Sequence, residues 1–110
     1  MKAVQFARFG GADVLEYVDV PQPSPHSGDV LIEVTAAGLN YVDIRERQGV
    51  YQQAETHVGG VTLPRIPGLQ AVGIVTKLGP SGDQSLIGKK VVALLPDGAV
   101  MRSMCASRRQ

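Results

Sequence analysis

Short apolar runs, each closed by glycine or proline, are the feature of this sequence that most limits its fold. The 110 residues include 13 Gly and 7 Pro, most of which fall between the runs. Turn residues at such intervals are typical of domains built from short strands, whereas helices need longer uninterrupted stretches. A chain of this length has room for one domain. The spacing therefore predicts a single, mainly β domain.

Alternation of apolar and polar side chains marks the expected strands. Residues 30–39 are the clearest, because β-branched residues there alternate with polar ones. The other strands are expected at residues 3–8, 14–20, 71–78 and 87–96. The first of these runs up to a Gly-Gly pair and is expected to form a hairpin or meander with the second.

The period changes after the third expected strand. Residues 41–48 lack Gly and Pro, with Asn40 just ahead as a candidate N-cap and Gly49 just past the end, which predicts one or two helical turns. Residues 50–64 are polar and irregular. We expect them to form a surface loop that could close over something.

Bulk properties exclude several function classes. The net charge is +1 with Lys and Arg scattered, so nucleic acid and membrane surfaces are not expected partners. No apolar run is long enough to span a bilayer, and the start has no signal-peptide pattern. The single Cys105 excludes an internal disulfide and a cysteine-rich metal site. His26 and His57 are expected to be solvated, and the protein to be soluble and cytoplasmic.

Blocks of sequence in a fixed order point to a family. They lie at residues 1–4, 28–34, 37–43, 66–75 and 88–93. Their order and spacing resemble the amino-terminal domain of the medium-chain dehydrogenase/reductase superfamily, over residues 1–98. The resemblance implies a GroES-like, partly open β-barrel with one short helix. In that superfamily a Rossmann domain follows, and the active site lies in the cleft between the two.

The positions that would bind zinc separate the branches of this superfamily. Zinc-dependent alcohol dehydrogenases place Cys and His where this chain has Asn40 and Leu69. An amide or an alkyl side chain cannot replace a thiolate or imidazole ligand, so no catalytic zinc is expected. The pattern resembles the crystallin-like NADPH:quinone oxidoreductases. It implies metal-free hydride or electron transfer from NADPH to a quinone or an α,β-unsaturated carbonyl compound.

The resemblance also assigns cleft roles. Asn40 would face the nicotinamide or the substrate carbonyl, although it could instead serve only as a helix N-cap. Tyr51 would line the mouth of the cleft against a planar acceptor, or equally pack as an ordinary loop residue. Neither residue's own sequence context decides between these readings.

Four further residues have weaker assignments. Asp43 and Arg47 would shape or steady the site, but their i, i+4 spacing also fits an exposed helix pair, and that simpler reading is favoured. Leu69 and Gln70 would form the floor where zinc enzymes hold their metal. Gln70 departs from the usual Glu.

A nucleotide site is not expected on this chain. No Gly-x-Gly-x-x-Gly fingerprint occurs among its residues. NADPH would serve the intact family enzyme, and no tight binding to this chain alone is expected. The choice between NADPH and NADH stays open.

The family pattern breaks after Gly98. A strand resembling Gly-Tyr-Ala-Glu-Tyr-Val should follow, but residues 99–110 show no alternation. One choice of codons for this tail, read two nucleotides later, encodes Gly-Tyr-Ala-Glu-Tyr-Val-Arg-Val-Pro-Pro-Ala. We therefore expect a truncated GroES-like domain over residues 1–98 and a non-family tail over 99–110, from a frameshift, a divergent end or an artefact.

Three functions follow from these observations. The first is the substrate-side domain of a quinone or enone oxidoreductase, inactive in this form. The second is a stand-alone GroES-like binding module without catalysis, and the third is an inert product. Incomplete sheets would leave unpaired edges and exposed apolar surface, so marginal stability and self-association are expected.

Overall fold

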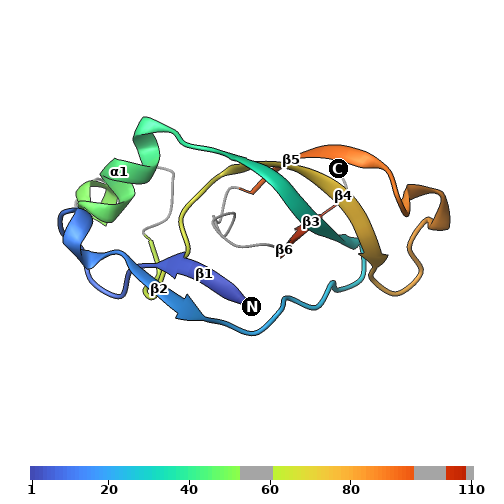
Figure 1. The fold of residues 1–110 in the computed structure, drawn as a ribbon, viewed down its shortest axis with the longest axis horizontal. Helices are drawn as coiled ribbons and strands as arrows, with labels where there is room; N and C mark the ends of the chain where they lie inside the picture. The colour runs from blue at the N-terminus through green and yellow to red at the C-terminus, as the bar shows by residue number, and fades with distance from the viewer. Residues whose placement is uncertain (53–60, 96–103, 109–110) are drawn as a thin grey trace.

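A computed structural model describes residues 1–52, 61–95 and 104–108, and shows two separate antiparallel sheets (Figure 1). The smaller sheet is a hairpin of β1 (Lys2–Gln5) and β2 (Glu16–Asp19). The larger has the order β5-β4-β3-β6, formed by β3 (Asp29–Gly38), β4 (Gln70–Leu78), β5 (Lys90–Leu94) and β6 (Met104–Arg108). Within the described residues the strands do not close into a barrel.

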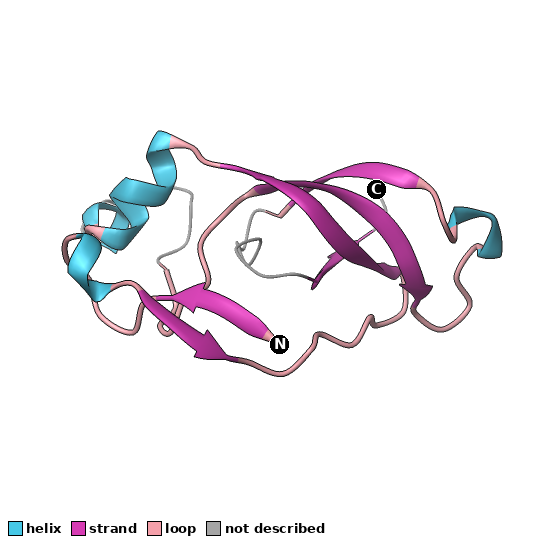
Figure 2. Ribbon diagram, in the orientation of Figure 1, coloured by secondary structure: helices cyan, strands magenta, loops and turns pink. Residues whose placement is uncertain are grey.

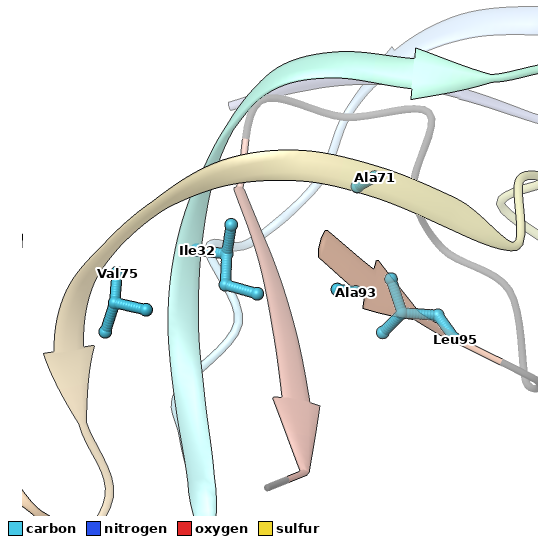
Figure 3. Packing of buried hydrophobic residues seen from close by; sticks show 5 residues of the cluster. All are labelled: Ile32, Ala71, Val75, Ala93 and Leu95. Atoms are coloured by element: carbon cyan, nitrogen blue, oxygen red, sulfur yellow. The ribbon is translucent and has the colours of Figure 1, made fainter. Parts of the chain in front are cut away.

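The core lies between strands of the larger sheet. Side chains from β3, β4 and β5, and from the residue after β5, pack together there (Figure 3): Ile32, Ala71, Val75, Ala93 and Leu95. A smaller cluster of Phe6, Val14 and Val61 supports the hairpin. The buried residues on β4 follow the expected alternation, because half-buried residues separate them, whereas the two buried residues of β3, Leu31 and Ile32, are adjacent.

Gly73 allows β3 and β4 to approach closely. It pairs with Val34. A Cβ atom at this position would collide with the carbonyl oxygen of Glu33 and lie 2.5 Å from Cγ2 of Ile32. A side chain here would therefore push the two central strands apart.

The helix α1 (Tyr41–Arg47) lies beside the hairpin, at the opposite end of the molecule from the turn after β4 (Figure 2). Three short 3₁₀ segments complete the described structure: η1 (Ala12–Val14), η2 (Val50–Gln52) and η3 (Gln84–Leu86). The α-helix begins after Asn40, as expected from the sequence. In the part of the chain that is described, no helix is long and apolar enough to cross a membrane.

The mainly β fold with one short helix and no closed barrel confirms the expected fold class. Three local expectations were wrong. The last expected strand begins only at Lys90, because the residues before it form η3 and a turn in which Gly88 has a φ of +82°. Within residues 50–64, Val50–Gln52 form η2 and Val61 is buried in the smaller cluster beside Phe6, so the described parts of this segment are not wholly an irregular surface loop. His57 and the middle of that segment lie outside the described residues.

The third difference concerns the tail. Residues 99–110 showed no strand pattern, yet Met104–Arg108 pair with β3 in the register Asp29↔Arg108 to Glu33↔Met104. Backbone donors and acceptors form such a ladder without requiring a particular side-chain alternation. This edge of β3 is therefore covered.

Candidate substrate cleft

A cleft of about 590 Å³ opens between α1, the hairpin and the turn before β4. Most of its lining is apolar, contributed by Val4, Phe6, Leu15, Leu39, Ile44 and Pro67, with Tyr41 beside them. Its remaining lining residues are Asn40, Asp43 and Arg47. A mostly apolar hollow with a few polar groups is the usual form of a small-molecule site.

The helical period brings the cleft-lining residues of this segment to one side of α1. Asn40, Asp43, Ile44 and Arg47 follow the spacing i, i+3, i+4 and i+7. With 3.6 residues per turn, these positions fall on one face of a helix. A helix of only seven residues therefore lines the cleft along its whole length.

Asn40 has both of the roles that its sequence context left open. It is the N-cap residue of α1, and its backbone N–H donates to Oδ2 of Asp43 at 2.9 Å. Asn40 is also one of the residues that line the cleft, and its buried Nδ2 has no hydrogen-bond acceptor among the described residues. A buried donor without a partner costs about 1–3 kcal/mol. An acceptor oxygen on a bound molecule would remove that cost.

Asp43 fixes the entrance to the helix. Its side chain is buried, and Oδ1 accepts the backbone N–H of Gly68 at 3.2 Å while Oδ2 accepts that of Asn40. The carboxylate therefore holds the turn before β4 against the start of α1. The favoured expectation of an exposed Asp43–Arg47 pair was wrong, because both carboxylate oxygens bond to backbone amides in a buried position.

Arg47 attaches the other end of the helix to the loop after β1. The backbone N–H of Gly10 donates to the Arg47 carbonyl at 2.9 Å, and Arg47 Nε lies 3.4 Å from the Gly10 carbonyl oxygen. This loop leads through η1 to Leu15, which forms one wall of the cleft. Arg47 thus both lines the cleft and holds that wall.

A buried ion pair lies next to the cleft-lining face, and sequence reasoning missed it. Arg65 donates through one Nη2 to both carboxylate oxygens of Glu46, at 3.0 and 3.1 Å, with side chains 12% and 6% exposed. The pair joins α1 to a segment distant in the chain. Neither residue lies in a motif or a local spacing that could have revealed it.

The remaining expected site residues lie elsewhere. Tyr51 is half-buried in η2, Leu69 is half-buried, and Gln70 is exposed at the start of β4, with Oε1 close to Gly38. None of the three is among the described residues that line the cleft. Pro67, two residues before Leu69, is the described residue of this segment that lines the cleft.

Sequence reasoning also missed the apolar rim of the cleft. Leu39 is 81% exposed, Tyr41 70% and Ile44 40%. Three large apolar side chains gathered around one opening form a patch of the kind found where a ligand or another protein surface packs. The one signal available was the place of Leu39 and Tyr41 on either side of Asn40 in the Leu-Asn-Tyr segment.

No cluster of metal-binding side chains forms in the described part of the chain: no three of its His, Cys, Asp and Glu residues gather. The polar side-chain groups of the lining residues are the amide of Asn40, the hydroxyl of Tyr41, the guanidinium of Arg47 and the carboxylate of Asp43, whose oxygens already accept backbone hydrogen bonds. These groups suit hydrogen bonding to an uncharged or anionic organic molecule.

Comparison with known proteins points to the same fold. The family model described as "Alcohol dehydrogenase GroES-like domain" matches residues 26–110. The human protein "Synaptic vesicle membrane protein VAT-1 homolog-like" is 34% identical over 96% of this chain and 24% of its own length. The chloroplastic "NADPH-dependent alkenal/one oxidoreductase" of Arabidopsis thaliana is 34% identical, over 91% of this chain and 25% of its own.

Solved structures agree with these relatives. The quinone oxidoreductase from Coxiella burnetii superposes with a TM-score of 0.83 at 32% sequence identity, covering 98% of this chain and 34% of that one. The chain spans about a quarter of the length of the human and Arabidopsis thaliana relatives. The expected resemblance to the amino-terminal domain of the quinone oxidoreductase branch is confirmed.

Proposed function

This chain belongs to the family of alcohol dehydrogenase GroES-like domains, and on that premise we propose that its cleft is the substrate side of an NADPH-dependent oxidoreductase. The proposed substrates are quinones or α,β-unsaturated carbonyl compounds. Quinone and alkenal reduction are named in the relatives with about one-third identity.

The unpaired Nδ2 of Asn40 is the observation that carries this proposal. A planar acceptor packed against Ile44 and Pro67 could place a carbonyl oxygen on that donor. NADPH, when bound, supplies a hydride to the conjugated carbon of the acceptor. The chain's own contribution is to orient the acceptor, to exclude water with the apolar lining, and to donate a hydrogen bond from Asn40 as negative charge develops on the oxygen. A donor placed in this way stabilises the charge more than bulk water does.

Metal-free chemistry is part of the proposal. It is supported by Asn40 and Leu69 at the positions where zinc-dependent relatives carry ligands, since neither side chain binds zinc well. Metal analysis of the purified protein tests this. Stoichiometric zinc that survives dialysis against a chelator would contradict it.

We also propose that this chain alone does not turn over NADPH. The support is the absence of a Gly-x-Gly-x-x-Gly fingerprint from its sequence. Titration followed by NADPH fluorescence tests the point, and tight binding would overturn it. If quinone binds but no turnover occurs with NADPH present, the chain acts as a binding module.

The division at residue 98 and the cytoplasmic location remain proposals as well. The shifted reading of residues 99–110 supports the division, although the family model matches through residue 110. Sequencing the gene tests it, because a shifted open reading frame must continue the family pattern. Cell fractionation tests the location.

Binding of a quinone to this chain tests the role of the cleft. Asn40→Ser retains an N-cap residue but removes the amide donor. We expect it to weaken binding by about tenfold, the loss of one buried hydrogen bond. Gln48→Ser, at the exposed C-cap of the same helix, is the matched control. Equal binding by both variants would contradict the proposal.

A further inference from the structure

We propose that the cleft favours acceptors that carry a negative charge about 10 Å from the carbonyl group, the rise of seven helical residues between Asn40 and Arg47. This inference rests on the proposed function, because it takes Asn40 as the carbonyl donor. It adds that Arg47 selects among acceptors by their charge. The preferred substrate class is then a carboxylated quinone or enone.

The lack of a carboxylate partner for Arg47 among the described residues is the first support. Its Nε atom faces Gly10, which leaves four of the five guanidinium donors for other partners. Among the ion pairs of the described residues, Arg65 has Glu46 and Arg8 has Asp13, but none includes Arg47. A half-buried guanidinium in a mostly apolar cleft gains most from a carboxylate, because bidentate charge-assisted bonds are the strongest available to it.

The position of Asp43 makes the preference depend on distance. Asp43 is the acidic residue of the cleft lining and lies one helical turn from Arg47. Its carboxylate would repel an anion placed near the middle of α1. An acceptor whose carboxylate reaches past Asp43 to Arg47 avoids this repulsion, whereas a shorter one does not. Affinity should therefore peak at one chain length.

The test uses 2-methyl-3-alkyl-1,4-naphthoquinones whose alkyl chain ends in a carboxylate, each paired with its methyl ester. Both reactive ring positions are substituted, so the probes do not alkylate Cys105. Binding to this chain is followed by quenching of tyrosine fluorescence. We expect the acid of best length to bind about tenfold more tightly than its ester, as one charge-assisted contact predicts. Added salt should reduce that ratio.

Variants of Arg47 test whether this residue causes the preference for the acid over the ester. Arg47→Gln should abolish the acid-to-ester ratio, and Arg47→Lys should retain part of it. Lys77→Gln makes the same charge change on β4, outside the cleft lining, and should leave the ratio unchanged. Urea unfolding of each variant establishes that it is folded.

The outcomes separate the two proposals. Equal affinity for acid and ester, or a ratio that persists in a folded Arg47→Gln, would overturn the charge preference while leaving the cleft as a quinone site. Binding of neither compound would overturn the proposed function and this inference with it.

Discussion

Two groups of polar residues on the short helix α1 differ in their hydrogen bonding. In the first, Asp43 and Glu46 are buried and every carboxylate oxygen accepts a hydrogen bond. In the second, Nδ2 of Asn40 and the charge of Arg47 lack comparable partners within the described residues. Polar groups whose hydrogen bonds are satisfied stabilise the fold, whereas unsatisfied ones are available to a ligand. The comparison therefore assigns stability to the first group and binding to the second.

The largest loss of stability should come from breaking the ion pair between Glu46 and Arg65. Glu46→Ala removes the carboxylate that accepts two hydrogen bonds from the Arg65 side chain, which is 12% exposed, and we expect the free energy of unfolding to fall by about 3 kcal/mol. Urea unfolding measures this. Asp19→Asn breaks the exposed pair with Lys2 and should cost less than about 1 kcal/mol. Similar losses in the two variants would contradict a stabilising role for the buried carboxylates of α1.

A smaller loss is expected at Asp43. Asp43→Asn has nearly the same shape but places an NH2 group against one of the two backbone N–H donors. We expect a loss of about 2 kcal/mol, typical of a broken charged hydrogen bond in a buried position. Asp13→Asn, at an exposed position in η1, provides the comparison. A stable Asp43→Asn variant would show that the turn at Gly68 is held by something else.

For Asn40 we expect a small effect on stability and a larger effect on binding. Because its Nδ2 has no partner, Asn40→Ser should change the unfolding free energy by less than about 1 kcal/mol, within the range for exchanges between good N-cap residues. Thermal or urea unfolding of the variant measures this directly. A loss as large as that of Asp43→Asn would place Asn40 with the structural residues.

The smallest change in stability is expected on the rim. Leu39→Ser removes an apolar side chain that is 81% exposed, so stability should stay within about 0.5 kcal/mol. Binding of an apolar quinone should nevertheless weaken, because the rim loses contact area. Quinone titration of the variant checks this, and unchanged affinity would exclude Leu39 from the site.

The sequence predicted those parts of the molecule that depend on local pattern. The strands around Ile32 and Val75 and the helix after Asn40 follow from period and capping, which neighbouring residues determine. The contacts of Glu46 with Arg65 and of Asp43 with Gly68 join segments 19 and 25 residues apart, and no local rule brings them together.

The candidate site was predicted in part for the same reason. Asn40 and Arg47 share one helix, so motif and period place both in the cleft. Tyr51 and Leu69 were placed by motif position alone, and their surroundings depend on how the chain packs after η2. Their assignment to the cleft remains a prediction.

Arg65 connects the hairpin to α1, so we expect these two elements to open together. Its backbone exchanges two hydrogen bonds of 2.9 Å with Phe6, while its side chain holds Glu46 of α1. Releasing Arg65 therefore frees the hairpin and the helix in one event. Amide hydrogens of Phe6 and Arg65 should exchange with solvent at a common free energy of opening, as members of one cooperative unit. The cleft would then open and close as a whole, without independent motion of its walls.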